Sequence, residues 1–146
     1  VFQTKGDIRF MKYALIGCGR ISPNHIAAAR NNGLELTAIC DTEVSCMADK
    51  MLKFKLGSTV KQYTDYTEMI ITETPELVAI CTESGKHAEI ALFCIEHGCN
   101  CIIEKPIALS IADADAIIAT SIKNDSLLEG VQRELIIFYI LPSKKY

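Results

Sequence analysis

The sequence predicts an α/β protein built on a doubly wound parallel sheet. Apolar segments of strand length alternate with amphipathic helical segments from Met11 to Asn124, a pattern typical of parallel strands joined by helices. The strand segments are continuous apolar runs, as expected for strands covered by helices on both faces. A glycine-rich turn joins the first strand segment to the first helical segment. The 146 residues of the chain are enough for one domain.

The expected strands are short apolar runs. In chain order they cover residues 13–16, 36–40, 60–63, 77–81 and 100–103. Helices are expected between them, at residues 21–32, 44–52, 65–71 and 88–95, because apolar residues recur there at spacings of three and four. Pro23 lies in the first turn of the first helix, where its missing N–H would have no intrahelical partner. Ser110 is expected to cap a last helix, with Asp113 at its third position.

We expect residues 1–10 to be an extension in front of the domain. They contain no apolar segment of a secretory signal, and the ordered pattern starts at Met11. Residues 11–124 are expected to form the domain. Residues 125–146 are expected to form a divergent tail, in which residues 135–141 could add one last strand.

Composition and charge argue against two classes of function. Fifteen lysine and arginine residues stand against eighteen aspartate and glutamate residues, for a net charge of −3, whereas nucleic-acid-binding domains usually carry a basic excess. No apolar run reaches the roughly 18 residues that a membrane span requires. We therefore expect neither a nucleic-acid partner nor a membrane-spanning segment.

Seven cysteines, at positions 18, 40, 46, 81, 94, 99 and 101, raise the question of redox state. A secreted disulfide-rich domain usually has an even number of cysteines, and Cys99 and Cys101 are closer together than the usual pair of zinc ligands. Cys40 and Cys81 lie in or beside apolar runs, as buried free thiols do. We expect free thiols, no metal site and a reducing, cytoplasmic location.

A glycine-rich loop follows the first expected strand. It reads Gly17-Cys18-Gly19-Arg20-Ile21-Ser22, a G-x-G-x-x-S pattern between a strand and a helix. In dinucleotide-binding folds the first glycine allows a tight turn, and the second lets the backbone approach a pyrophosphate at the N-terminus of the helix. The alternatives are a strand–turn–helix without a ligand and a loop that binds S-adenosylmethionine.

Asp41 ends the second expected strand, twenty-four residues after Gly17. An acidic residue near this position accepts hydrogen bonds from the adenosine ribose hydroxyls of NAD. Its charge would repel the additional phosphate of NADP, and Thr42 supplies no arginine to offset that repulsion. We therefore expect NAD rather than NADP. The alternative is that Asp41 caps the helix that starts near Val44.

Glu104-Lys105-Pro106 follows the fifth expected strand. Ligands of open α/β sheets bind beyond the carboxyl ends of the strands, so Lys105 would point into the crevice. There it could orient a substrate hydroxyl or tune proton transfer at the carbon that exchanges hydride. The alternative is a surface charge pair before a turn.

Residues 13–21, residues 82–87 and Glu104-Lys105-Pro106 together resemble segments of the Gfo/Idh/MocA oxidoreductases. Residues 63–66 and 108–110 strengthen the resemblance, which covers residues 11–124 in order. These are NAD(P)-dependent enzymes that act mostly on sugars, cyclitols and nucleotide sugars. Within the family the sequence is most similar to dehydrogenases of UDP-N-acetylhexosamine and its uronic acid. The resemblance implies a Rossmann NAD(P)-binding fold.

The resemblance also implies roles for individual residues. Gly17, Gly19 and Ile21 would lie against the pyrophosphate, with Arg20 also among the cofactor-binding residues, and Asp41 would hold the adenosine ribose. The nicotinamide side would be lined by Thr82, Ser84 and His87, with Glu104 on the nicotinamide ribose and Lys105 as the catalytic or substrate-orienting lysine. His25 and His97 lie on expected helices and are not expected to be catalytic.

The sequence departs from the family in three respects. Glu83 stands where the family usually has proline, and Ser22 where it has glycine or alanine. The family's C-terminal α/β substrate domain, which covers the crevice and binds the sugar, has no counterpart here. We therefore expect the cofactor domain of a truncated enzyme, inactive alone and self-associating into a homo-oligomer through its exposed apolar surface. The alternatives are a non-catalytic dinucleotide-binding or dimerisation module and a domain whose cofactor site is unused.

Overall fold

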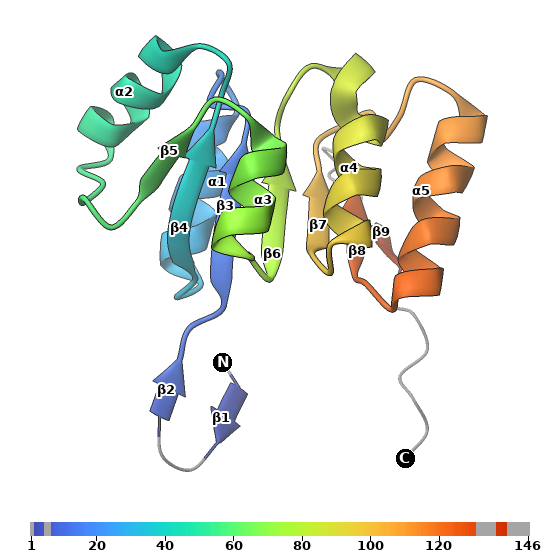
Figure 1. Ribbon diagram of the computed structural model, residues 1–146, viewed down its shortest axis with the longest axis horizontal. Helices are drawn as coiled ribbons and strands as arrows, with labels where there is room; N and C mark the ends of the chain where they lie inside the picture. The colour runs from blue at the N-terminus through green and yellow to red at the C-terminus, as the bar shows by residue number, and fades with distance from the viewer. Residues whose placement is uncertain (1, 5–6, 131–136, 140–146) are drawn as a thin grey trace.

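Seven strands form the central sheet of the computed structural model, which describes residues 2–4, 7–130 and 137–139. Their order across the sheet is β5-β4-β3-β6-β7-β8-β9 (Figure 1). The strands from β5 to β8 are parallel. Numbered along the chain, these six have the order 3-2-1-4-5-6 of a Rossmann fold. The doubly wound parallel sheet expected from the sequence is therefore confirmed.

The strands and helices alternate as the apolar pattern predicted. The strands are β3 (Lys12–Ile16), β4 (Glu35–Cys40), β5 (Lys61–Tyr63), β6 (Leu77–Ile80), β7 (Asn100–Ile103), β8 (Leu128–Gly130) and β9 (Ile137–Tyr139). The helices are α1 (Ser22–Asn31), α2 (Val44–Lys53), α3 (Tyr66–Glu73), the short 3₁₀ turn η1 (Ser84–Lys86), α4 (His87–Glu96) and α5 (Ile111–Asn124). Up to Asn124, each expected strand and helix is present, with small differences in its bounds.

The two faces of the sheet pack against different helices. Ala14 and Ile16 of β3 belong to an apolar cluster with α3, α4 and α5, whereas Tyr13 and Leu15 pack on the opposite face with α1 and α2. These four side chains are at most 2% exposed. Burial on both faces explains why the strands are continuous apolar runs instead of alternating ones.

Two helices begin at the caps that the sequence predicted. The Asp65 carboxylate accepts a hydrogen bond from the backbone N–H of Thr67 at 2.8 Å, and the Ser110 hydroxyl accepts one from the backbone N–H of Asp113 at 3.1 Å. Each bond satisfies an N–H of the first helical turn that has no partner within the helix.

The sixth parallel strand, β8, was not predicted from the sequence. Its three residues, Leu-Glu-Gly, contain one apolar side chain and therefore no apolar run. These residues form a strand because they pair with β7, with Leu128 opposite Cys101 and Gly130 opposite Ile103. Part of the strand expected at residues 135–141 is present as β9, which is antiparallel to β8; the rest lies outside the described residues.

The expected N-terminal extension contains a small separate sheet. Strands β1 (Phe2–Thr4) and β2 (Asp7–Arg9) pair with each other in antiparallel fashion and lie below the main sheet in Figure 1. Within the described parts of the chain, no helix is both long enough and apolar enough to cross a membrane.

All seven cysteines are free thiols, and all except Cys46 are buried. Burial in an apolar environment disfavours the thiolate and raises the pKa of Cys18, Cys40 and Cys99 to about 12. The Cys94 thiol hydrogen-bonds with Cys101, and this bond together with burial raises the pKa of Cys94 well above its usual value.

Thiol reactivity should follow this burial, because the thiolate is the nucleophile. At pH 8, iodoacetamide should modify Cys46 rapidly and the six buried cysteines only when the chain unfolds. Mass spectrometry of the digested protein after timed labelling measures this. Rapid labelling of Cys18 in the folded protein would contradict the described packing.

Candidate functional site

A cavity of about 510 Å³ lies beyond the carboxyl ends of β3, β4 and β6. The strand order reverses between β3 and β6, so the connections after these two strands diverge and leave a crevice. Residues that the sequence analysis singled out line the cavity: Gly17, Gly19, Asp41 and Thr82, together with Thr42 and Glu83. The sheet therefore brings together three loops that are far apart in the sequence.

Gly17 lies where the backbones of three strands meet. Its N–H donates a hydrogen bond to the carbonyl oxygen of Cys40 at 2.8 Å, and its φ of +95° favours glycine. A Cβ at this position would lie 2.6 Å from the carbonyl carbon and oxygen of Cys81. No other residue fits the turn without moving the end of β6.

Gly19 is constrained in a different way. A Cβ at this position would meet nothing within 4 Å, so the protein itself does not require a glycine there. The open space lies in front of the N-terminus of α1, where backbone N–H groups and the helix dipole favour an anion. A bare backbone that faces open space at a helix N-terminus fits the pyrophosphate of a dinucleotide.

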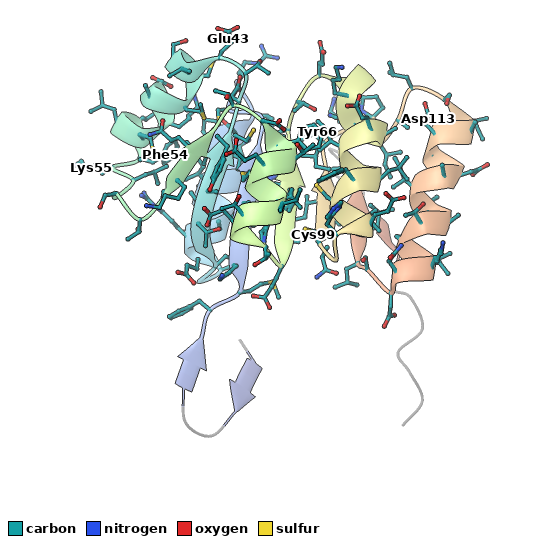
Figure 2. All side chains as sticks on the ribbon, in the orientation of Figure 1. Glu43, Phe54, Lys55, Tyr66, Cys99 and Asp113 are labelled. Atoms are coloured by element: carbon teal, nitrogen blue, oxygen red, sulfur yellow. The ribbon has the colours of Figure 1, made fainter. Side chains whose placement is uncertain are left out.

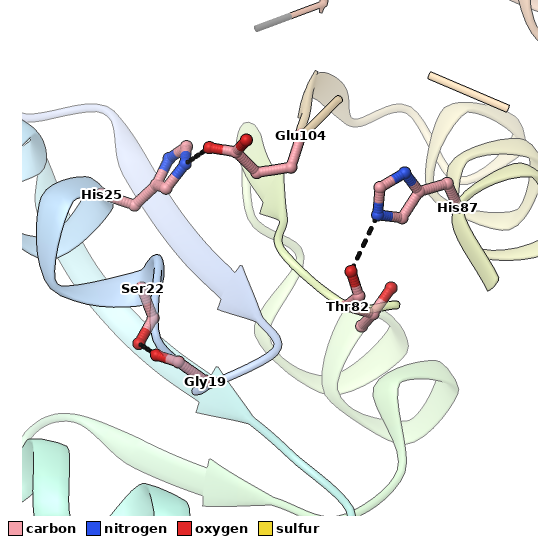
Figure 3. Close-up of polar contacts among 6 residues, drawn as sticks. All are labelled: Gly19, Ser22, His25, Thr82, His87 and Glu104. Atoms are coloured by element: carbon pink, nitrogen blue, oxygen red, sulfur yellow. Dashed lines mark hydrogen bonds and ion pairs between the residues drawn. The ribbon is translucent and has the colours of Figure 1, made fainter. Parts of the chain in front are cut away.

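Ser22 fixes the shape of the same loop. Its side chain is fully buried, and its hydroxyl donates a hydrogen bond to the carbonyl oxygen of Gly19 at 2.6 Å (Figure 3). The backbone N–H of Ser22 also donates to this oxygen, at 3.3 Å. Ser22 therefore fits at the position where the family usually has glycine or alanine. Its two hydrogen bonds hold the Gly19 carbonyl oxygen toward α1.

Asp41 connects the end of β4 to the glycine-rich loop. Its Oδ2 accepts a hydrogen bond from the backbone N–H of Cys18 at 2.7 Å, and its Oδ1 accepts one from the N–H of Glu43 at 2.8 Å. Glu43, not Asp41, is the N-cap residue of α2, so the alternative that Asp41 caps this helix is wrong. Carboxylate oxygens have further lone pairs, which leaves Asp41 able to accept hydrogen bonds from ligand hydroxyls.

His87 is a buried residue beside the cavity. It is the first residue of α4 and only 1% exposed. Its ring nitrogens contact two carbonyl oxygens. Nδ1 lies 2.8 Å from that of Pro106, and Nε2 lies 2.9 Å from that of Thr82, the contact drawn in Figure 3. His87 itself is not among the residues of the cavity wall, although its ring contacts Thr82, which is; its role toward a cofactor stays a prediction.

The Glu104-Lys105-Pro106 turn lies at the end of β7, outside the wall of this cavity. The N–H of Glu104 donates to the carbonyl oxygen of Ile80 at 3.0 Å, and the Lys105–Pro106 peptide bond is cis. Lys105 is exposed. Oε1 of Glu104 lies 2.7 Å from Nε2 of His25. Glu104 therefore contacts His25, and the alternative of a surface charge pair between Glu104 and Lys105 is wrong.

The remaining expected site residues lie at the edges of the same region. Arg20 and Ile21 follow Gly19 in the loop before α1 and are both exposed. Ser84 begins η1, directly after the cavity residues Thr82 and Glu83. None of the three belongs to the cavity wall.

Several residues of the cavity wall were not proposed as site residues from the sequence, among them Tyr66, Lys86 and Glu89. Tyr66 is the first residue of α3 and lies on the side toward α4 (Figure 2), where its hydroxyl donates to Glu89 Oε1 at 3.2 Å. Burial, followed by the charge of Glu89, raises the pKa of Tyr66 to about 12. Lys86 Nζ lies 3.8 Å from Glu89 Oε2. Their position shortly after β5 and β6 was the signal that could have identified them.

Comparisons with known proteins agree with this architecture. Residues 11–129 match the Gfo/Idh/MocA oxidoreductase family, NAD-binding Rossmann fold. A D-apiose dehydrogenase from Paraburkholderia graminis is 32% identical over 120 residues, which cover 82% of this chain and 31% of that protein. An inositol 2-dehydrogenase from Salmonella paratyphi B is 28% identical over 116 residues, covering 78% of this chain and 34% of that protein.

A solved structure gives the same result. The WlbA dehydrogenase from Chromobacterium violaceum, in complex with NADH and UDP-GlcNAcA, has a TM-score of 0.77 and 26% identity to this chain. The match covers 85% of this chain and 35% of the WlbA chain. This chain thus spans about a third of the length of the relatives that it matches.

The two loop glycines should respond differently to substitution. Gly17→Ala should lower the free energy of unfolding by at least about 2 kcal/mol. The positive φ at this position is unfavourable for alanine, and the added Cβ would clash with the backbone of Cys81. Gly19→Ala, the matched control, should leave stability nearly unchanged. Thermal unfolding followed by circular dichroism measures both. An unchanged melting temperature for Gly17→Ala would contradict the described turn.

Proposed function

The chain belongs to the Gfo/Idh/MocA family of oxidoreductases, and we propose on this premise that its cavity binds NAD. The observation that carries the proposal is the open space over Gly19 beside the Asp41 carboxylate. This arrangement places an anion-binding helix N-terminus next to a hydrogen-bond acceptor for ribose hydroxyls. In the whole protein, this domain would serve a dehydrogenase that acts on a sugar or nucleotide sugar.

Each part of the cavity would hold a different part of the cofactor. The pyrophosphate would lie over Gly17 and Gly19, where no side chain keeps it from the backbone. The adenosine ribose would bond to Asp41, and the adenine would lie toward Tyr66 and Ile90 on the far wall. NAD, when bound, supplies or accepts the hydride; the residues named here only bind and orient it.

The charges around Asp41 favour NAD over NADP. The loop after β4 reads Asp41-Thr42-Glu43 and contains two carboxylates and no cation. Lys50, on the following helix, is buried, and its Nζ pairs with Asp49 Oδ2 at 2.6 Å. A 2′-phosphate would therefore meet the Asp41 carboxylate, and the loop after β4 supplies no positive charge to offset the repulsion.

Lys105 is the residue that we propose for the reaction itself. It is exposed and follows β7. Because β7 is parallel to β6, its carboxyl end lies at the same edge of the sheet as the cavity. An ammonium group there can orient a sugar hydroxyl and move its proton as the carbon gains or loses hydride. Because hydride transfer also requires a positioned sugar and exclusion of water, we expect no turnover by these 146 residues alone.

The proposal predicts cofactor binding that depends on Gly19 and Asp41. Titration of the chain with NADH, followed by nucleotide fluorescence, should show saturable binding, and Gly19→Ala should weaken it at least about tenfold because a methyl group fills the pyrophosphate site. Asp41→Asn should reduce the preference for NADH over NADPH, since the amide has no charge; its single oxygen can keep one of the two N–H bonds, from Cys18 and Glu43, that the carboxylate accepts.

Two results would count against this assignment. No binding at millimolar NADH would remove the proposed function. An equal loss of NADH and NADPH affinity in Asp41→Asn would remove the role of Asp41 in choosing between the cofactors, while leaving cofactor binding itself intact.

A further inference from the structure

Two histidines contact the Glu104-Lys105-Pro106 turn from opposite sides. His25 lies on α1, the helix that follows the glycine-rich loop, and His87 is the first residue of α4. His25 Nε2 lies 2.7 Å from Glu104 Oε1, and His87 Nδ1 lies 2.8 Å from the carbonyl oxygen of Pro106. Figure 3 shows the two rings on either side of Glu104.

We propose that His25 and His87 are positioning residues that hold this turn for the nicotinamide half of the cofactor. The inference rests on the proposed function, because the turn is where the nicotinamide ribose and Lys105 are expected to meet. Neither imidazole lies in the cavity wall. Each acts through a neighbour: His25 through the Glu104 carboxylate and His87 through the Pro106 carbonyl.

The His25–Glu104 contact is well protected from water. The side chains of His25 and Glu104 are 11% and 13% exposed, respectively, so solvent competes little for either group. A hydrogen bond to a carboxylate is stronger than one between neutral groups. The contact links α1, whose N-terminus faces the proposed pyrophosphate site, to the end of β7. It therefore fixes the position of Glu104 relative to the proposed pyrophosphate site.

His87 joins the turn to the cavity wall. The ring lies between the carbonyl oxygens of Thr82 and Pro106, at 2.9 Å and 2.8 Å. Thr82 lines the cavity, so the ring connects the loop after β6 to the turn after β7. A neutral imidazole has one N–H and donates to one of these oxygens, whereas an imidazolium donates to both.

Lys105 lies between the two anchored residues. The side chain of Glu104 is held by His25, the carbonyl of Pro106 is held by His87, and the N–H of Glu104 is held by Ile80 at 3.0 Å. Lys105 itself is exposed. The direction in which its ammonium group extends therefore depends on the anchored backbone on both sides of it.

A comparison of two ligands tests the role of His25. NADH spans the whole proposed site, whereas ADP occupies only the part near Gly19 and Asp41. His25→Leu should weaken NADH binding about tenfold, the effect of losing one hydrogen bond to a charged group, and change ADP binding less than about twofold. His25→Gln keeps a donor near the position of Nε2 and should restore most of the NADH affinity.

Three other results of this titration would contradict the proposal for His25. Equal losses of NADH and ADP affinity in His25→Leu would show that His25 only supports α1, and would overturn the positioning role. An unchanged NADH affinity in His25→Leu would also overturn it. If the unmodified chain binds neither ligand, the proposed function fails, and the inference that rests on it fails with it.

Two substitutions test His87 without emptying its site. Asn keeps a donor near the position of Nδ1 and can reach the Pro106 carbonyl, whereas Gln keeps one near Nε2 and can reach only the Thr82 carbonyl. His87→Asn should therefore bind NADH more tightly than His87→Gln by about threefold or more, with equal ADP affinities confirming that both variants are folded. An equal or tighter NADH affinity in His87→Gln would overturn the proposal for His87.

Discussion

The contact of the Gly17 backbone with the ends of two neighbouring strands is the constraint on which the site depends. Gly17 donates its N–H to the carbonyl of Cys40 at the end of β4, and the space that a Cβ would occupy is filled by the backbone of Cys81 after β6. The chain can leave β3 between these strands only because Gly17 has no side chain. This turn brings the loops after β3, β4 and β6 around one cavity.

Around this turn, the described polar contacts mostly join a side chain to a backbone group. Asp41 accepts the N–H of Cys18, Ser22 donates to the carbonyl of Gly19, and His87 contacts the carbonyls of Thr82 and Pro106. Contacts of this kind fix the course of the loops before any ligand binds, and preorganisation reduces the entropy lost on binding. His25 and Glu104 differ, because they are a side-chain pair that joins α1 to the residue after β7; Tyr66 and Glu89 in the cavity wall also form a side-chain pair.

Features with a local cause in the sequence could be predicted from it. The apolar runs, the helix caps at Asp65 and Ser110, and the turn at Gly17 all follow from the residue types at those positions. Strand β8 could not be predicted, because its three residues include one apolar side chain and show no periodicity; they form a strand by pairing with β7. The cavity residues Tyr66, Lys86 and Glu89 were missed because helix packing, not a motif, brings them together.

The sequence by itself determined the alternation of strands and helices, the glycine-rich loop and the acidic residue after the second strand, because each depends on residues close together in the chain. Only the tertiary structure decided how the histidines are used. His25 pairs with a residue 79 positions away, and His87 contacts a carbonyl 19 positions away. Such contacts arise when parallel strands align their carboxyl ends, and no spacing in the sequence encodes the direction in which a buried ring faces.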